Sequence, residues 1–249
     1  MLNLNRDNIS KKVLLGFDYS VMAMLDGVAV HQDIIAPLTS LKSAAAKAGF
    51  DLRVVSGFRS FERQLAIWNA KAAGERVLLD DTGQVLEWAA LSESELIAAI
   101  LRWSALPGAS RHHWGTDVDV YDAAAVASDY RVQLTPAEVA DNGVFGPLHQ
   151  WLDGEFAAGR GCGFFRPYNL DRGGIAPERW HLSYAPLAAV CDWALGIEVL
   201  EEALKQREDL RLKETILREL PSIYRRYVAV PASCYPLAFV EALSGREAL

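Results

Sequence analysis

Cysteine is scarce in this sequence, and its three copies, Cys162, Cys191 and Cys234, are odd in number and widely spaced. That pattern supports neither a disulfide framework nor a cysteine-ligated metal cluster, so we expect buried free thiols. A surplus of basic residues is also lacking, because the formal net charge is −7. Nucleic-acid partners require Lys and Arg clustered on one face, and we therefore expect none.

Long apolar runs are lacking as well. No stretch of about 18 uncharged apolar residues occurs, so no transmembrane segment is predicted. Near the N-terminus, Lys11 and Lys12 precede a short apolar run, but Asp18 interrupts it. The run falls short of the roughly 7–15 apolar residues of a signal peptide. We therefore expect a cytoplasmic location.

The composition is otherwise that of an ordinary globular protein, with 249 residues of which 51% are hydrophobic and 23% charged. Such a length is enough to bury a sizeable core. Apolar spacings near 3.6 and short alternating runs indicate a mixture of helices and strands. Helices are predicted at 34–48, 61–73, 92–104, 135–140 and 148–156, and strands at 51–56, 117–122 and 180–184. Residues 75–87, with turn-forming residues at 80–83, are predicted to be a surface hairpin or loop.

The composition changes after about residue 195. Residues 1–195 are predicted to form the principal domain, and residues 196–249 a charged, helical C-terminal extension. Pro221 is expected to start a separate helix within that extension. The extension either covers the principal domain or forms an interaction surface.

Two pairs of residues could share a metal ion. His112 lies in a loop and Asp119 follows on a strand, and Gly115 between them lets the chain turn back. Glu178 and His181 form the second pair. Neutral imidazole and carboxylate are good zinc ligands, and a catalytic zinc site has three protein ligands and one open position.

A carboxylate that touches the attacking water without binding the metal has a task in hydrolysis. Zinc lowers the pKa of a bound water from 15.7 toward about 7, and the carboxylate takes the proton and passes it to the leaving amine. Glu178 is the candidate for this role. Arg59, at a strand-to-helix junction, is the candidate to stabilise the oxyanion or to hold the carboxylate of the substrate.

Three segments resemble a known family. Residues 110–119 (Ser-Arg-His-His-Trp-Gly-Thr-Asp-Val-Asp) resemble the Ser-x-His-x-x-Gly-x-x-x-Asp motif of the VanY-type D-alanyl-D-alanine carboxypeptidases and dipeptidases. Residues 178–181 (Glu-Arg-Trp-His) resemble their Glu-x-x-His motif. Residues 56–60 (Ser-Gly-Phe-Arg-Ser), followed by Glu62 and Gln64, resemble the Ser-Gly-Tyr-Arg-Ser segment upstream of both.

The resemblance implies an α+β fold, with a small central antiparallel sheet flanked by helices, as in the hedgehog and D,D-peptidase proteins, and a motif-bearing core at about 34–186. It implies a zinc peptidase that binds one Zn²⁺ ion through His112, Asp119 and His181, with Glu178 and Arg59 as catalytic residues. The implied substrate is a peptidoglycan-derived peptide ending in D-Ala-D-Ala. The residues expected to contact it are Ser110, Gln64, Asp117 and Arg166.

Two positions depart from the family pattern. Asp117 stands where a small residue is usual, so an additional carboxylate either approaches the metal site or makes a salt bridge beside it. Phe58 replaces the common Tyr. Of the other histidines, His113 is expected to face the substrate or to pack with Trp114, and His31 and His149 to lie at surface or helix positions.

Two alternative functions are kept open. One is an endolysin-like endopeptidase that cuts between L-alanine and D-glutamate. The other is a binding module that keeps zinc as a structural brace without turnover. Glu178 discriminates between enzyme and brace, because a brace needs no carboxylate beside the water.

Overall fold

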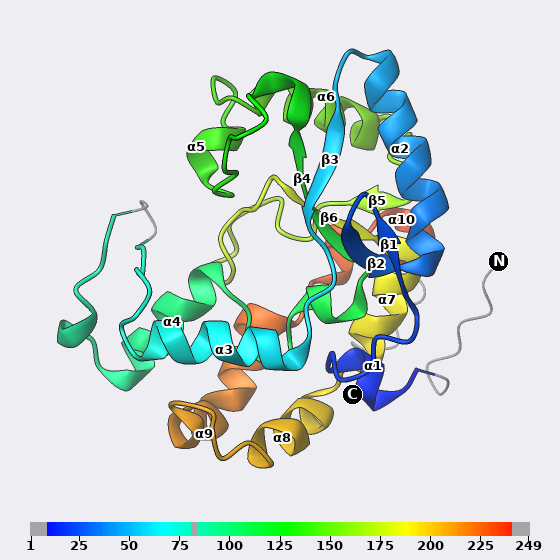
Figure 1. The fold of residues 1–249 in the computed structure, drawn as a ribbon. Helices are drawn as coiled ribbons and strands as arrows, with labels where there is room; N and C mark the ends of the chain where they lie inside the picture. The colour runs from blue at the N-terminus through cyan, green and yellow to red at the C-terminus, as the bar shows by residue number, and fades with distance from the viewer. Residues whose placement is uncertain (1–8, 81–83, 241–249) are drawn as a thin grey trace.

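A computed structural model describes residues 9–80 and 84–240 of the chain. A four-stranded antiparallel sheet lies at the centre of the fold (Figure 1). The strand order is β3-β4-β6-β5. The strands are β3 Leu52–Ser56, β4 Asp117–Asp122, β5 Phe164–Phe165 and β6 His181–Tyr184. β4 pairs with both β3 and β6, and Asp119 lies opposite His181 in the register. The two strands that were expected to carry metal ligands are therefore neighbours.

The two faces of this sheet differ in polarity. Val118, Val120 and Leu182 are buried in one apolar cluster with Val54 of β3. Because successive side chains of a strand point to opposite faces, the residues between them lie on the other face. That second face carries Asp117 and Asp119 of β4 beside His181 of β6.

Two helices cover the apolar face. Leu38 and Leu41 of α2 (Ile35–Lys47) and Leu148 and Leu152 of α6 (Gly146–Ala157) are buried against the valines of the sheet. α2 ends at Lys47, with Ala48 as its C-cap ahead of Gly49, which has a positive φ, as expected from its sequence. Figure 1 shows α2 and α6 beside β3 and β4.

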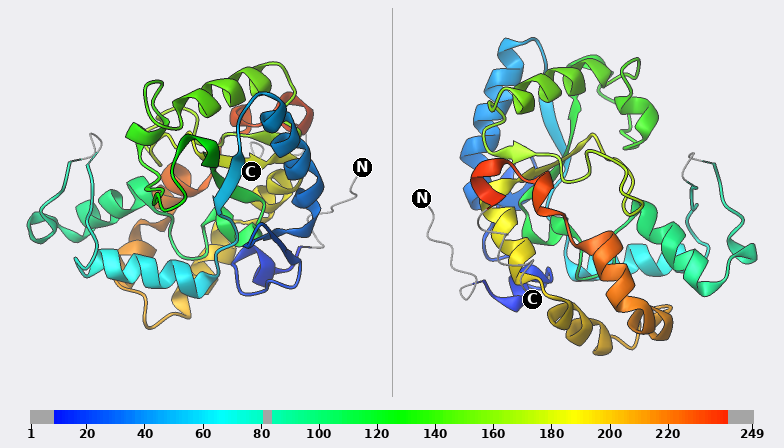
Figure 2. Two further views of the ribbon diagram at one scale, coloured as in Figure 1. Left: turned by 45° about the horizontal axis from the view of Figure 1, so that its top comes forward. Right: turned by 180° about the vertical axis from the view of Figure 1, so that it is seen from behind.

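A second apolar core joins the remaining long helices. It contains buried side chains of α3 (Phe61–Ala72), α4 (Glu93–Trp103) and α7 (Ala185–Ala194), and also of α8 (Ile197–Lys205) and α9 (Lys213–Ile223). Ser60 caps α3, and Ser92 with Glu95 forms the predicted capping box of α4. The C-terminal extension thus packs as a cover on α3 and α4 (Figure 2).

Several elements differ from those predicted. The prediction that Pro221 starts a helix is wrong, because Pro221 lies inside α9 and the chain continues into a π-helix, Tyr224–Val228. A proline inside a helix removes one backbone donor, and α9 continues past it nonetheless. The hairpin of β1 (Met22–Leu25) and β2 (Val28–His31), and α7, were not predicted. Short helices lie at Lys11–Leu14 (α1), Pro136–Val139 (α5) and Leu237–Val240 (α10).

The hairpin expected at 75–87 agrees with the structure, and the expectation of buried free thiols holds for one cysteine of the three. Leu79 and Val85 form an antiparallel bridge, in keeping with a hairpin at 75–87, whereas residues 81–83 of its expected turn lie outside the described residues. Cys191 is a buried free thiol, while the free thiols of Cys162 and Cys234 are only partly buried. None of the described helices has the length and apolarity to cross a membrane. The fold is α+β with a small antiparallel sheet, as predicted.

Candidate active site

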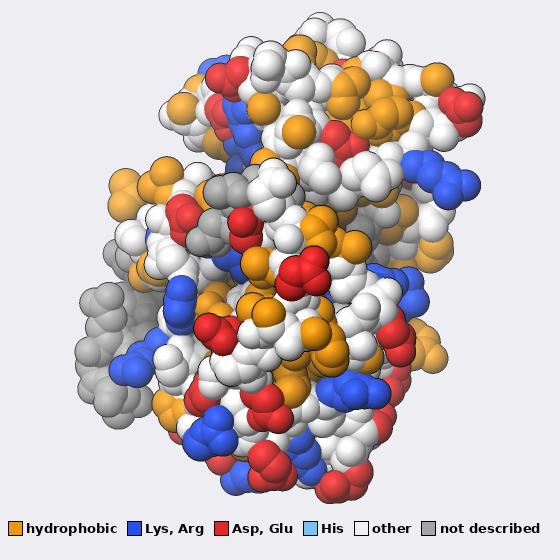
Figure 3. Space-filling model, turned by 90° about the vertical axis from the view of Figure 1, so that its left-hand side faces the viewer, with side chains coloured by type: hydrophobic (Ala, Val, Ile, Leu, Met, Phe, Trp, Pro, Cys, Tyr) orange, Lys and Arg blue, Asp and Glu red, His pale blue; other side chains and the backbone are white. Residues whose placement is uncertain are grey.

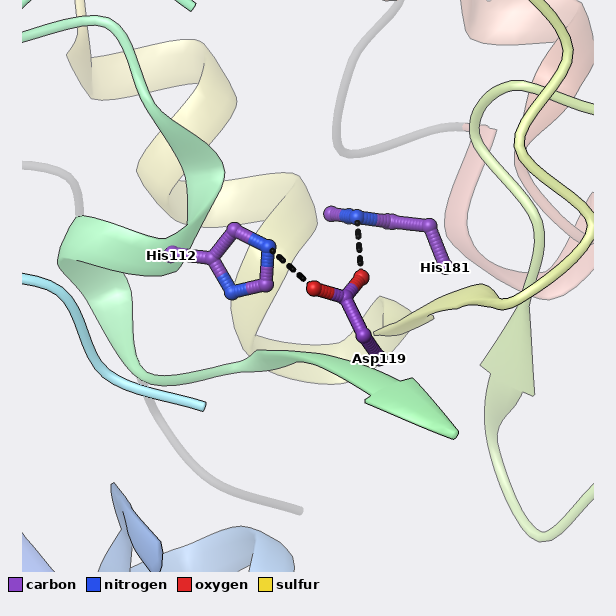
Figure 4. Close-up of side chains that lie close together, drawn as sticks. All are labelled: His112, Asp119 and His181. Atoms are coloured by element: carbon purple, nitrogen blue, oxygen red, sulfur yellow. Dashed lines mark ion pairs between the residues drawn. The ribbon is translucent and has the colours of Figure 1, made fainter. Parts of the chain in front are cut away.

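Three side chains from two strands and one short helix point toward one another (Figure 4). Asp119 is on β4, His181 on β6, and His112 on the 3₁₀ helix Arg111–Trp114 that leads into β4. One ligand atom of each lies within 4.8 Å of the others. Gly115 makes the turn between helix and strand with φ +66°, and a Cβ there would lie 2.4 Å from Met22 Sδ, so the position requires glycine.

Hydrogen bonds fix which nitrogen of each imidazole faces the centre of the site. His112 Nδ1 donates to the Gly57 carbonyl oxygen at 2.8 Å, which leaves Nε2 facing Asp119 Oδ2 at 3.4 Å. His181 Nε2 donates to Asp117 Oδ1 at 2.9 Å, and its Nδ1 lies 3.2 Å from Asp119 Oδ1. A histidine that ligates a metal commonly donates its other N–H to a carbonyl or carboxylate, and both rings follow that rule.

The donor set fits a divalent cation. Asp119 Oδ1 is buried and makes no hydrogen bond, although a buried carboxylate oxygen needs a partner. Burial opposes the charged form of His181, but the adjacent carboxylates of Asp117 and Asp119 outweigh it and raise its pKa to about 10. His112 and His181 in turn hold the pKa of the buried Asp119 well below its usual range. The pocket thus favours a positive charge, and two nitrogens and one carboxylate suit zinc.

A buried network of hydrogen bonds and ion pairs lies next to the Nε2 side of the His181 ring. Asp117 accepts from Arg111 Nε at 2.8 Å, and from Thr116 and Ser183 at 2.7 and 3.1 Å. Arg111 also donates to Asp192 Oδ2 at 2.9 Å. The hydroxyl of Tyr235 donates to the same oxygen at 2.6 Å. The contacts therefore run from the C-terminal extension to the imidazole of His181.

These polar contacts correct the expectation that Asp117 contacts substrate. Its side chain is wholly buried between Arg111 and His181, so it does not contact substrate and instead makes the salt bridge beside the metal site. Arg111 was missed in the sequence because its partners Asp192 and Tyr235 lie 81 and 124 residues further along the chain. No local pattern could indicate such contacts.

Glu178 lies at the edge of the same site. Its Oε2 is 3.6 Å from His181 Nδ1, and the residue lines the cleft that contains His112, Asp119 and His181. Burial raises the pKa of Glu178 to about 7, with Asp119 adding to the rise and His181 opposing it. A carboxylate with a pKa near neutrality can both accept and deliver a proton at physiological pH.

Arg59 provides a cation on the other side of the cleft. Its guanidinium donates to Gln64 Oε1 at 2.9 Å and to Ser56 Oγ at 3.4 Å. Burial lowers its pKa, while Asp119 and Glu178 act in the opposite direction. Gln64 is wholly buried and donates to Ala105 O at 2.6 Å. The expectation that Gln64 contacts substrate is therefore corrected, because its amide holds Arg59 in place.

The cleft has a volume of about 300 Å³ and is walled by loops that the sequence did not single out. Ser110, expected to contact substrate, lines it. Residues 133–136 form one wall, and the aromatic side chains that line the cleft include Trp103 and Tyr168. The indole Nε1 of Trp103 is buried without a hydrogen-bond partner among the described residues, so the wall holds an unused donor. Figure 3 shows a groove between the part with α5 and α6 and the part with α3 and α4.

Arg166 does not line this cleft, and its expected contact with substrate is corrected. Its guanidinium donates to Arg179 O at 2.7 Å and pairs with Asp153, and it lines a separate cavity. His149, buried in α6, lies 3.2 Å from it. His113 is also wholly buried: Nδ1 donates to Arg59 O at 2.6 Å and Nε2 accepts from Gly108 N, so it does not face substrate.

Residues 27–187 match the model of a family described as VanY, D-alanyl-D-alanine carboxypeptidase. The chain belongs to this family. The match spans all three segments that resembled it in the sequence, and membership of VanY places the chain among the metallopeptidases. Residues 188–249, which include Asp192 and Tyr235, lie outside the match.

Individual proteins and solved structures are also similar to this chain. An uncharacterised protein of Haemophilus influenzae is 51% identical over 67 residues, 27% of this chain, and the chain spans 46% of that relative. The structure of VanYB with D-alanine-D-alanine is 23% identical with a TM-score of 0.48, covering 75% of this chain and 89% of that one. A variant of the VanY D,D-pentapeptidase with Zn(II) is 25% identical with a TM-score of 0.47, covering 74% and 91%.

Proposed function

We propose that this chain is a zinc-dependent D,D-carboxypeptidase that removes the terminal D-alanine from peptidoglycan-derived peptides. The observation that carries the proposal is the convergence of His112, Asp119 and His181 within 4.8 Å, with Glu178 beside them in one cleft. Membership of the VanY family supports the choice of substrate. We propose that the site holds one zinc ion.

The ligand roles follow from the hydrogen bonds. His112 would bind zinc through Nε2 and His181 through Nδ1, because the other nitrogen of each ring is held by Gly57 and Asp117. Asp119 would contribute a carboxylate oxygen. When bound, zinc supplies a Lewis acid that polarises the scissile carbonyl and makes the attacking water more acidic.

The remaining steps belong to the protein. Glu178 takes a proton from the attacking water and delivers it to the nitrogen of the departing D-alanine. Attack places negative charge on the carbonyl oxygen, and the half-buried Arg59 guanidinium, with its donors oriented by Gln64 and Ser56, is positioned to stabilise it. Ser110, on the cleft wall, supplies a hydroxyl for the carboxylate of the terminal residue.

The position of Glu178 favours an enzyme over a structural zinc brace. Its carboxylate reaches into the cleft and is not part of the three-residue ligand group. A metal that serves only as a brace is enclosed by four ligands and leaves no open position. The three candidate ligands would leave one position of a tetrahedral zinc ion open, and Glu178 lines the same cleft.

Mass analysis of products tests this function. The zinc-loaded protein is expected to shorten a peptide ending in L-Lys-D-Ala-D-Ala by one D-alanine, and to leave the matching peptide ending in D-Ala-L-Ala intact. Release of a fragment from the interior would instead identify an endopeptidase. Release of D-alanine only from peptides ending in L-Lys-D-Ala would identify an L,D-carboxypeptidase, and absence of any cleavage would refute the peptidase proposal.

A further inference from the structure

A second cavity lies next to the metal cleft and is rich in arginine. It has a volume of about 240 Å³ and lies between the loop 167–175 and residues 225–231, which belong largely to the π-helix after α9. Arg172, Arg225 and Arg226 line it, and its lining includes no Asp or Glu among the described residues. We call it the arginine pocket. A π-helix is rare and often occurs at functional sites.

The three arginines have no close carboxylate partner among the described residues, although Arg226 is near enough to Asp171 to contribute to the lowered pKa of that carboxyl. Over residues 9–80 and 84–240 none of them forms an ion pair with a carboxylate, although the chain has more acidic than basic residues. Arg172 donates to the Leu170 carbonyl oxygen at 3.1 Å and to Asn169 Oδ1 at 2.9 Å. Arg226 donates through Nε to the Gly173 carbonyl oxygen. Asp171, in the same loop, accepts from Arg102 Nη1 at 3.0 Å.

The loop between the two cavities is tightly held. A Cβ on Gly174 would lie 2.0 Å from the Arg226 carbonyl oxygen, so only glycine lets the loop pack this closely on the π-helix. Tyr168 and Ile175 of this loop line both the arginine pocket and the metal cleft. The Tyr168 carbonyl oxygen accepts from Glu178 N at 3.0 Å. The arginine pocket is therefore adjacent to the site of chemistry and shares a wall with it.

We propose that the arginine pocket binds an oxyanion, a carboxylate or a phosphate, carried by the substrate at a distance from its scissile bond. Three like charges around one cavity repel one another, and a bound oxyanion removes that cost while accepting paired N–H donors. Leu170, Ile175 and Val228 give the pocket apolar walls. It therefore suits an oxyanion attached to an aliphatic or ring-shaped group. The identification of this oxyanion as part of the substrate rests on the proposed function, whereas oxyanion binding itself does not.

Direct binding tests the pocket independently of catalysis. Isothermal titration of the zinc-loaded protein with inorganic phosphate and, separately, with glutarate would identify which oxyanion binds. The variant Arg225→Gln removes a charge from an exposed side chain, and Arg172→Gln is the second variant. Either is expected to weaken binding by about tenfold or more, as for loss of a charge-assisted contact. Binding that is undetectable, or equal in wild type and both variants, would overturn the proposal.

A matched control is available on α9. Arg218 is exposed and pairs with Glu219 at 3.1 Å, outside the arginine pocket. Arg218→Gln is expected to bind the oxyanion as the wild type does. Equal loss in Arg218→Gln and Arg225→Gln would mean that net charge, and not the pocket, attracts the anion, and would overturn the proposal.

Kinetics then connect the pocket to substrate. Arg225→Gln is expected to raise KM about tenfold for a muropeptide that carries additional carboxylates or a phosphate, with kcat unchanged, as for lost uniform binding. KM for a short D-Ala-D-Ala peptide without further acidic groups is expected to stay the same. Unchanged KM for both would overturn the substrate assignment. If no peptide is cleaved at all while phosphate or glutarate still binds through Arg225, the peptidase proposal fails and the oxyanion site stands.

Discussion

The surroundings of Glu178 give its carboxyl group a pKa suited to proton transfer. A carboxylate exposed to water has a pKa near 4.3 and would be a weak base, but burial beside Asp119 raises the pKa of Glu178 to about 7. The position of its Oε2, 3.6 Å from the Nδ1 of His181, places it beside a ligand without making it one. Charge at this residue can therefore change during a reaction without releasing the metal.

The pH dependence of kcat/KM tests this role. Because the base works only when it is deprotonated, and the pKa of Glu178 is raised to about 7, activity is expected to fall as the pH drops through about 7. Glu178→Gln is expected to lower kcat by about 10²–10⁴-fold, the usual range for a proton-transferring side chain, and to lose this acidic limb. Zinc content should stay at the wild-type level.

The control for this experiment is Glu201→Gln, which changes a partly exposed residue of α8 paired with Lys205. It is expected to keep the wild-type rate and profile. A Glu178→Gln protein with full activity would show that Glu178 is not the proton carrier. Loss of zinc from this variant would contradict the statement that Glu178 lies beside the metal ligands without being one.

At the scale of strands and helices, the pairing of β4 with β6 brings the site together. Asp119 and His181 face each other in the register, and Asp117, two residues earlier on β4, reaches the far nitrogen of the same imidazole. One strand thus supplies both a ligand and the group that orients another ligand. The tautomer of His181 depends on this arrangement.

Replacing Asp117 tests the pairing. Asp117→Asn keeps the shape but removes the charge that His181 and Arg111 share, and zinc affinity is expected to fall by about 10–100-fold, as for other groups that orient metal ligands. Competition with a zinc-binding dye would measure it. Asp122→Asn, at the other end of β4, is the matched control and is expected to leave zinc affinity unchanged. Equal affinities in wild type and Asp117→Asn would contradict the assigned role.

Sequence patterns predicted the elements that carry the ligands because their signals are local. The alternation at 117–122 and the short run at 51–56 indicated β4 and β3, and a capping box marked α4. The β1–β2 hairpin had a signal too, since Asp26 and Gly27 lie between two apolar runs and both have positive φ. That signal was overlooked. The prediction that Pro221 starts a new helix was wrong because α9 continues through this proline.

The remaining part of the site had no local signal. Asp117 stood out because it occupies a position where the family usually has a small residue, and it was also expected to contact substrate. Its true partner is Arg111, which is held in turn by residues 81 and 124 positions away. Such contacts depend on how the C-terminal extension packs, and that packing is not encoded in the spacing of any motif.

On the scale of the whole molecule, the C-terminal extension supports the metal site as well as covering helices. After α9 the chain runs back across the molecule toward β5 and α7 (Figure 2). There the Tyr235 ring packs on Phe165 of β5 at 4.5 Å between centroids. Its hydroxyl joins Asp192 and accepts from Arg111 at 3.2 Å. The part of the chain outside the family match therefore contributes to the surroundings of His181.

Tyr235→Phe tests this long-range contribution. Removing the hydroxyl leaves buried groups of Asp192 and Arg111 with one partner fewer, which is expected to cost about 1–3 kcal/mol of folding stability. Zinc affinity should also fall, by less than in Asp117→Asn. Tyr224→Phe, which loses a hydroxyl that donates to the Leu195 carbonyl oxygen at 2.6 Å, is the control. Its thermal stability is expected to drop without a change in zinc affinity, and equal zinc affinities in both variants would contradict the link.

The central claim is that His112, Asp119 and His181 together hold one zinc ion. Metal analysis of the purified, zinc-loaded protein tests it most directly. We expect about one zinc per chain in the wild type, and affinity reduced by several orders of magnitude in His112→Ala and His181→Ala, because a catalytic zinc needs three protein ligands. His31→Ala, away from the cleft, should bind as the wild type does. Full zinc binding in His112→Ala and His181→Ala would contradict the account.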